Sequence, residues 1–372
     1  MFSVSYSQTH QKVISLIVSM NNSLDLGNKS RTILDGRCAR ILLEGPPPAT
    51  RFQLEARIVI CTLMILVTLF AILDNSLVII IVCLNRSRRT KTNILVVSLA
   101  VTDLLIALGP MPLSTYLMYT SLTWHIGDFV CLLLNSFDVY LCTLSIFHVS
   151  FMAIDRCLSV SYPFFYERVG KKSVILMLMT SWIAPIGFSF LPIMSQLYRI
   201  GLEDWYACAL PLGSTMGHCN FFANKPYSVA TFMAFVICLI IIMVCYLKIF
   251  YEARKQALQI RTLSVSDNDS SGKSVKQELK AAKTIGIILV AFSVCWLPSE
   301  IVSVANPFLG YKISDKVYGL VVWLGYVNSM LNPLIYYFSN RSYKESAKML
   351  LLRLRGQHVP NDALSMRHIR HR

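Results

Sequence analysis

The sequence predicts an all-α membrane protein: a seven-transmembrane helix bundle followed by a short amphipathic eighth helix. Of its 372 residues, 55% are hydrophobic and 15% are charged, whereas a soluble protein carries about 25% charged residues. The hydrophobic residues gather in stretches of roughly 20 or more, and each stretch is long enough to cross a bilayer. One stretch alone would fit a buried core helix, but seven in series with charged connectors predict membrane spans.

The predicted spans divide the chain into three parts. They cover residues 58–83, 93–118, 129–160, 174–194, 228–250, 284–304 and 317–338. An N-terminal tail (1–54) precedes the bundle (55–338), and a segment with the eighth helix and a tail (339–372) follows it. Residues 340–355 are basic and amphipathic, which predicts that the eighth helix lies along the inner membrane surface.

Basic residues near the span ends predict the orientation of the chain. They gather in the odd-numbered connectors and after the last span, for example at Arg88, Lys171 and Lys344, whereas the first outer connector has none. The odd connectors should therefore face the cytoplasm, with the N-terminus outside. The net charge of +15 flanks the spans, which favours anionic membrane lipids over nucleic acid as its partner.

The outer segments contain candidate modification sites. Asn21 and Asn28 begin N-x-S sequons, and a tail outside the cell would allow their glycosylation. Most of the eleven cysteines lie inside spans, but Cys131 and Cys219 lie at outer positions, where the compartment is oxidising. We predict a disulfide between these two. Cys38 and Cys208 are also outside, so arithmetic alone does not settle the pairing.

The third span carries a carboxylate at membrane depth. Such a group is costly unless it faces a partner, a cavity or a pathway, so Asp138 is a candidate functional residue. Asp155 and Arg156 end the same span, about 25 Å farther along the helix axis. This arrangement predicts a protein that binds a cation on its outer side and responds with a change at its inner end.

A second group of polar residues lies inside other spans and cannot face lipid cheaply. Turned inward, these residues would surround Asp103 with oxygen atoms that suit a small hard cation. The alternative is a water-filled hydrogen-bond network without an ion. The group comprises Asn75, Asp103, Ser145, Asn328, Ser329 and Asn332.

Six motifs, one per expected helix, make the chain resemble the rhodopsin-like G-protein-coupled receptors over residues of about 55–350. They are Asn75, Leu99-Ala100-Val101-Thr102-Asp103, Asp155-Arg156-Cys157, Trp182, Cys295-Trp296-Leu297-Pro298 and Asn332-Pro333-Leu334-Ile335-Tyr336. The resemblance implies a multi-pass plasma-membrane receptor without enzymatic activity. It also implies an allosteric Na⁺ near Asp103, a heterotrimeric G protein, expected to be of the stimulatory type, and arrestin and a receptor kinase as further partners.

Within that family the chain resembles the biogenic-amine receptors. Asp138 matches the aspartate that pairs with the ligand ammonium, and Trp323 and Tyr326 match the aromatic groups that enclose it. Stretches such as Asn224-Lys225-Pro226-Tyr227 are similar to the type-4 serotonin receptor, with trace-amine receptors as near neighbours. The predicted ligand-binding residues are Asp138, Cys142, Phe221, Thr231, Trp296, Ser299, Glu300, Trp323 and Tyr326.

Departures from the amine-receptor pattern leave two interpretations open. Ser299 and Glu300 stand where two phenylalanines are usual. Glu300 is either a second cation anchor that selects a diamine or polar amine, or a protonated, hydrogen-bonded carboxyl group. Asp138 itself is either the ligand anchor or a structural partner of Tyr326. Cys238 replaces the usual proline of the fifth span.

The resemblance also implies a switch at the inner end. Arg156, beside Asp155, would pair with Glu278 at rest and with the phenols of Tyr246 and Tyr336 when the helices part. Opening would admit the G protein, with Phe164 inserting into it. Ile146 and Phe292 match the family's packing switch.

The sequence leaves two alternative functions open. One is a receptor of the same fold for a peptide or lipid ligand, with Asp138 only structural. The other is a transporter or channel that uses the buried acids as an ion path. A transporter would favour inverted repeats and broken helices, which the sequence does not show.

Overall fold

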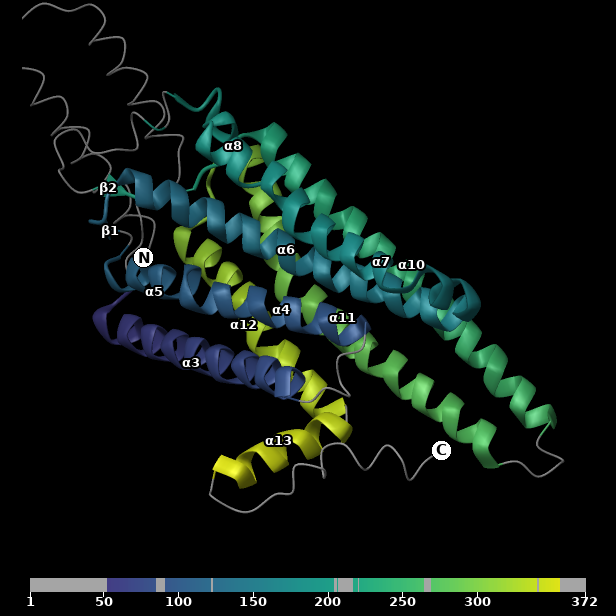
Figure 1. Ribbon diagram of the computed structural model, residues 1–372. Coiled ribbons are helices and arrows are strands. Elements are labelled where there is room, and N and C mark those ends of the chain that lie inside the picture. Colours follow the sequence, from purple (N-terminus) through teal and green to yellow (C-terminus); the bar gives the residue numbers. More distant parts are fainter. Residues whose placement is uncertain are drawn as a thin grey trace, which may run out of the picture.

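Long helices lie side by side in the computed structural model and form one bundle (Figure 1). The structure describes residues 52–84, 91–121, 123–203, 206, 217–219, 221–263, 269–339 and 341–354. Its elements are α3 (Leu54–Leu84), α4 (Lys91–Leu108), α5 (Pro110–Tyr119), β1 (Thr123–Trp124), α6 (Asp128–Ser161), α7 (Pro163–Ile183), η2 (Ala184–Gly187), α8 (Phe190–Met194), η3 (Leu197–Arg199), β2 (Gly217–His218), α10 (Lys225–Leu263), α11 (Asp269–Phe308), α12 (Asp315–Ser339) and α13 (Arg341–Leu354). The sequons at Asn21 and Asn28 lie outside the described residues.

Five helical segments in the described part of the chain are long and apolar enough to cross a membrane by length and composition. They are Leu54–Leu84, Asn93–Tyr119, Asp128–Ser161, Pro163–Met194 and Lys225–Glu252. Helices α11 and α12 occupy the sixth and seventh predicted spans and pack against the same bundle. The order of the helices therefore agrees with the predicted seven-span architecture.

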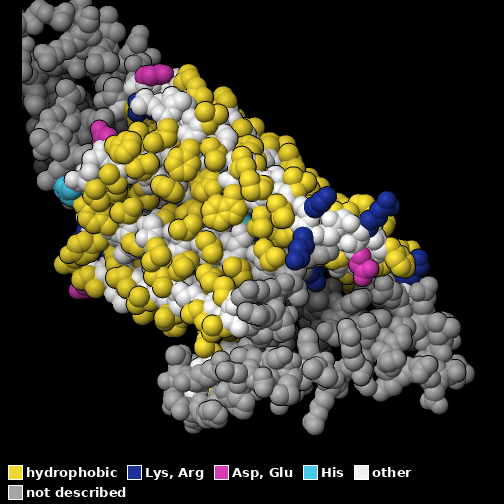
Figure 2. Space-filling view, in the orientation of Figure 1, with side chains coloured by type: hydrophobic (Ala, Val, Ile, Leu, Met, Phe, Trp, Pro, Cys, Tyr) yellow, Lys and Arg dark blue, Asp and Glu magenta, His cyan; other side chains and the backbone are white. Residues whose placement is uncertain are grey.

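The bundle exposes an apolar surface. Hydrophobic side chains cover most of the visible face in Figure 2, and Leu63, Phe70 and Ile240 are each more than half exposed. Such a large apolar surface is expected where lipid, not water, surrounds the helices. Lys and Arg side chains gather at the end of the bundle where α7 begins (Figures 1 and 2).

Two predicted spans are interrupted, which hydropathy did not reveal. In the second span, α4 ends at Leu108 and α5 begins at Pro110, because proline lacks an N–H and suits the first turn of a new helix. In the fourth span, α7 ends at Ile183 and a 3-10 turn containing Pro185 leads into α8. Inside α7, Gly170 has φ 62° and ψ −143°, so an inner turn meets the spanning part at an angle.

A short antiparallel strand pair is the exception to an all-α architecture. Thr123 pairs with His218 and Trp124 with Gly217, which joins two outer connectors. Trp124 is 2% exposed and its indole N–H donates to the carbonyl of Gly127 at 2.8 Å. This small sheet fixes the outer connectors over one end of the bundle.

The eighth helix packs against the inner part of the bundle. Helix α13 places Tyr343 and Ala347 in the same core cluster as Ile81 and Met152. It spans the predicted range except for residues 340 and 355, which lie outside the described residues. Its buried face explains why an amphipathic pattern follows the last span.

Candidate functional site

Asp138 lies on α6 and is held by a neighbouring helix. The Tyr326 hydroxyl on α12 donates a hydrogen bond to Asp138 Oδ1 at 2.6 Å, and the Cys142 thiol lies 3.7 Å from the same oxygen. Tyr326 is 2% exposed, so this bond is shielded from bulk solvent. A hydrogen bond to an ionised group is among the stronger polar contacts in proteins. It orients the carboxylate and leaves Oδ2 as a further acceptor.

A cavity of about 280 Å³ opens beside Asp138. It lies among α5, α6, α10, α11 and α12, and all nine predicted ligand-binding residues line it: Asp138, Cys142, Phe221, Thr231, Trp296, Ser299, Glu300, Trp323 and Tyr326. The sequence hypothesis therefore names residues that the fold brings together from segments far apart in the chain.

Aromatic rings form much of the cavity wall. Trp323 and Tyr326 meet edge to face with centroids 5.2 Å apart, and the Trp323 indole N–H donates to Ser114 Oγ at 2.9 Å. Phe221 stacks on Tyr198 with centroids 4.9 Å apart. These contacts fix the orientation of the rings, so a cation near Asp138 would meet preformed aromatic surfaces.

The other polar residues of the predicted set differ in their hydrogen bonds. The Ser299 hydroxyl donates to the Trp296 carbonyl at 2.9 Å, and the Thr231 hydroxyl donates to the Tyr227 carbonyl at 3.2 Å. Both hydroxyl protons are thus used within their own helices. Glu300 lines the cavity without a hydrogen bond or ion pair to any other described residue.

Several residues that line the cavity were not predicted from the sequence. Tyr318 lines the cavity, and so does Ser114, which holds Trp323 in place. Tyr318 could have been found from Tyr326, because positions i and i+8 fall within one broad stripe along a helix. Ser114 had no such signal, since its role depends on how α5 meets α12.

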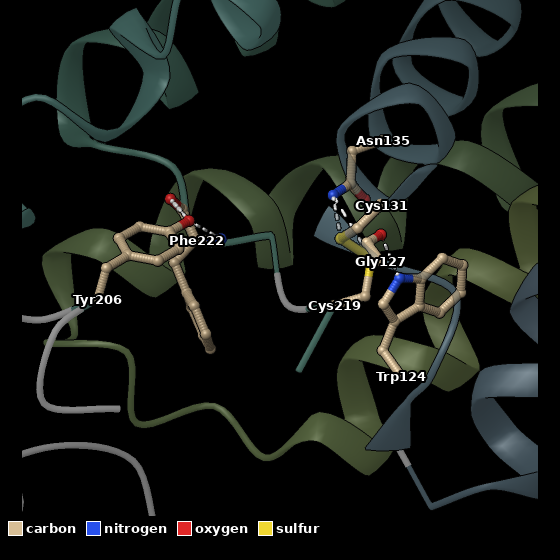
Figure 3. The surroundings of a disulfide bond; sticks show 7 residues. All are labelled: Trp124, Gly127, Cys131, Asn135, Tyr206, Cys219 and Phe222. Atoms are coloured by element: carbon tan, nitrogen blue, oxygen red, sulfur yellow. Dashed lines mark hydrogen bonds between the residues drawn. A yellow bond between two sulfur atoms is a disulfide. The ribbon is translucent and has the colours of Figure 1, made fainter. Parts of the chain in front are cut away.

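A disulfide lies at the edge of the cavity, which Cys219 lines, and Figure 3 shows its surroundings. Cys131 and Cys219 are joined, with an S–S distance of 1.97 Å and Cα atoms 5.6 Å apart. The Asn135 amide points toward both sulfur atoms (Figure 3), with nitrogen–sulfur distances of 3.5 and 3.9 Å. The bridge ties the start of α6 to the second outer connector. Cys38 and Cys208, which left other pairings open, lie outside the described residues.

The same connector is held beside the cavity by Tyr206. Its hydroxyl donates to the Phe222 carbonyl at 2.8 Å and accepts from the Phe222 N–H at 3.0 Å, as Figure 3 shows. Burial raises the pKa of the Tyr206 phenol, so it stays neutral and can both donate and accept. Phe222 itself lines the cavity.

The predicted polar cluster assembles deeper in the bundle. Asn332 Nδ2 donates to Asp103 Oδ2 at 2.9 Å, and Asn75 Nδ2 donates to the Ser329 carbonyl at 2.9 Å. Several buried oxygens of the cluster have no hydrogen bond from the described residues: Asn75 Oδ1, Asp103 Oδ1, Ser145 Oγ, Asn328 Oδ1 and Asn332 Oδ1. Buried polar atoms require a partner, so these oxygens fit either water or a small cation.

Packed aromatic rings connect the cavity to the hydrophobic core of the bundle. Phe292 lies between Trp296 and Phe235, with ring centroids 6.3 Å from each. Ile146 and Cys238 belong to the same core cluster. The residues of the predicted packing switch therefore belong to one cluster, and Ile146 and Phe292 also line the cavity.

At the inner end, Asp155 and Arg156 lie close together on α6. Arg156 Nη2 is 3.0 Å from Asp155 Oδ2, and the Tyr166 hydroxyl donates to Asp155 Oδ1 at 2.8 Å. Phe164 is 90% exposed in the first turn of α7. Tyr246 is half-buried on α10, whereas the side chains of Glu278 and Tyr336 lie outside the described residues.

Comparison with known proteins places this geometry among receptors. Residues 74–336 match the family described as 7 transmembrane receptor (rhodopsin family). The chain is 34% identical over 310 residues to 5-hydroxytryptamine receptor 4 of Homo sapiens, covering 79% of this chain and 80% of that protein. It is 33% identical over 312 residues to trace amine-associated receptor 5 of Mus musculus, covering 84% of this chain and 90% of that protein. It is 36% identical over 270 residues to trace amine-associated receptor 13c of Danio rerio, covering 71% of this chain and 77% of that protein.

Proposed function

This chain belongs to the rhodopsin family of seven-transmembrane receptors, and we propose that it binds a small cationic amine at Asp138 and activates a heterotrimeric G protein. It is a multi-pass plasma-membrane receptor of the aminergic class and not an enzyme. The alternatives of a transporter and of a receptor for another kind of ligand are not favoured, because the relatives are receptors named for amines.

The observation that carries this proposal is the position of Asp138 in the aromatic cavity. An ammonium group at Asp138 would combine a charge-assisted hydrogen bond with cation–π contacts to Trp323 and Tyr326. The bond from Tyr326 uses Oδ1 of the carboxylate. Since Oδ2 stays available, the structural pair and a ligand pair are compatible and can form together.

The proposal extends to the deeper polar cluster. A sodium ion would be held by Asp103 with oxygens of Ser145, Asn328 and Asn332, which lack hydrogen bonds from the described residues. Ser329 supports the site through its bonds to Asn75 and Asp103. A cation here would supply positive charge next to a buried carboxylate, which stabilises the ionised form of Asp103.

At the inner end, the proposed output is G-protein coupling. Exposed Phe164 would insert into the G protein, and Arg156 would exchange Glu278 for Tyr246 and Tyr336 on activation. We further propose coupling to the stimulatory type, interaction with arrestin and a receptor kinase, and an outside N-terminus glycosylated at Asn21 and Asn28. The charge asymmetry of the span ends supports this orientation.

The ligand proposal is tested by Asp138→Ala and Asp138→Asn. Loss of a buried, desolvated charge pair costs several kcal/mol, so the potency of amines should fall roughly a hundredfold or more. The measurement is a second-messenger dose–response curve for serotonin-like monoamines and short diamines. Surface expression is measured in parallel with an antibody to an N-terminal tag.

Asp128→Asn is the matched control for charge. Asp128 is exposed at the outer start of α6 and does not line the cavity, so its loss changes the net charge equally. Amine potency should stay within about threefold, because exposed charges are screened by salt. Equal potency in the wild type and both Asp138 variants would refute an amine site at Asp138.

A further inference from the structure

Glu300 is a second carboxyl group in the cavity that contains Asp138. It lies on α11, one helical turn or about 6 Å beyond Trp296. Both acids line the same space, and both lie close enough to the Tyr318 phenol to interact with it electrostatically. The two helices that carry these acids, α6 and α11, both contribute to the wall of the cavity.

The groups around Glu300 do not neutralise it. The nearby Tyr227 hydroxyl on α10 donates to the Phe188 carbonyl at 2.7 Å, and the Ser299 hydroxyl donates to the Trp296 carbonyl. Tyr318 on α12 lies 3.5 Å from Ser303 through its hydroxyl. Glu300 therefore receives no hydrogen bond from the described residues that face it.

The charged side chains among the described residues of the cavity wall are all acidic. Its described residues include Asp138, Glu300 and Asp315, but no Lys, Arg or His. A buried carboxylate without a donor is costly, and two acids that line one cavity raise the cost further. Of Asp138 and Glu300, Asp138 receives a hydrogen bond from Tyr326, whereas Glu300 receives none from the described residues.

We propose that this receptor selects a ligand with two cationic or strongly donating groups, one bound by Asp138 and the other by Glu300. The inference rests on the proposed amine function and names its ligand class. A short diamine would neutralise both acids at once, whereas a monoamine would leave Glu300 desolvated and unpaired. The carboxyl group of Glu300 also disfavours the apolar ring of an aromatic monoamine that would approach α11.

The test compares wild type with Glu300→Gln, using unbranched α,ω-diamines of increasing length and the corresponding monoamines. In the wild type, diamine potency should peak at one chain length, because only that length reaches both acids. Glu300→Gln keeps the size of the side chain but removes its charge. It should lower the potency of the best diamine about 30-fold or more and abolish the peak.

Glu300→Phe provides the reciprocal result. It replaces the acid with an aromatic ring, so serotonin-like monoamines should gain potency while the best diamine loses it. Asp128→Asn controls for a general loss of negative charge at the outer face and should keep the peak. Surface expression and displacement of a bound diamine by competition show that each variant is folded and that binding has changed.

The outcomes separate this inference from the proposed function. If monoamines act through Asp138 and Glu300→Gln leaves the diamine ranking unchanged, the inference is wrong and the amine function stands. If neither monoamines nor diamines act on the wild type, both are wrong. A diamine peak that disappears in Glu300→Gln and persists in Asp128→Asn supports the inference.

Discussion

Individual charged residues were the most predictable part of the site. Asp138 and Asp103 stood out because a carboxylate inside an apolar span needs a partner, and both have one in Tyr326 and Asn332. The directions of hydroxyl groups were not predictable. Thr231 donates to a carbonyl of its own helix, a choice that depends on side-chain rotamers and not on sequence spacing.

Gly325 has a packing role that residue type alone did not reveal. A Cβ atom there would lie 2.8 Å from the Trp296 ring, which cannot give way like the end of a flexible side chain. Gly325→Ala should therefore displace Trp296 or α12, and overpacking of this kind typically costs about 1–3 kcal/mol. The measurement is the apparent Tm of the receptor in detergent, which should fall.

Gly319→Ala is the matched control on the same helix. A Cβ atom there would lie 3.5 Å from Met118 Cε, an ordinary contact. The same substitution should therefore leave the Tm nearly unchanged or raise it slightly, because alanine favours a helix. Equal effects of the two alanines would contradict a specific clash with Trp296.

At the scale of elements, hydropathy located the spans and missed their interruptions. The helix boundaries at Leu108 and Pro110 depend on proline and glycine chemistry, which a hydropathy average does not register. The strand pair of Thr123 and His218 was missed for another reason. It consists of two residues on each side, and its partners are distant in sequence.

Helices α4, α6 and α7 are joined by one serine. The Trp182 indole N–H donates to Ser98 Oγ at 3.0 Å, so the Ser98 hydroxyl proton is free to point toward His148 Nε2, 2.7 Å away. His148 Nδ1 is 2.8 Å from the Leu144 carbonyl, which requires the ring proton at Nδ1. These three contacts form a complete chain of donors and acceptors.

Ser98→Ala should break this chain at its centre. It would leave the Trp182 N–H and His148 Nε2 unpaired in a partly buried site, and a fully buried unpaired group costs about 1–3 kcal/mol. The apparent Tm in detergent should therefore fall. Ser98→Thr keeps a hydroxyl and should restore part of the loss. A stable Ser98→Ala variant would show that water replaces the serine.

At the scale of the whole molecule, family membership was predictable and the ligand class was only partly so. The six motifs agree with the family match over residues 74–336. Overall identity does not separate the groups, at 34% and 33% to the serotonin and trace-amine relatives. The ligand class is therefore tested by substitution of Glu300 and not by overall similarity.

The inner end should control the resting state of the molecule through Arg156 and Glu278. A mutation shifts a two-state equilibrium only by its differential effect on the two states. Glu278→Ala removes a partner that Arg156 would have only at rest, so basal signalling should rise. A partly exposed ion pair is worth about 0.2–1 kcal/mol, which limits the rise to about fivefold.

Second-messenger production without ligand measures this effect, normalised to surface expression. Glu252→Ala, on the inner part of α10, is the matched control and should leave basal signalling unchanged. Arg156→Ala should instead lower signalling at saturating ligand, because the active state loses the group that meets the phenols of Tyr246 and Tyr336. If Glu278→Ala leaves basal signalling at the wild-type level, then this pair does not hold the helices together at rest, and Asp155, 3.0 Å from Arg156, is its main restraint.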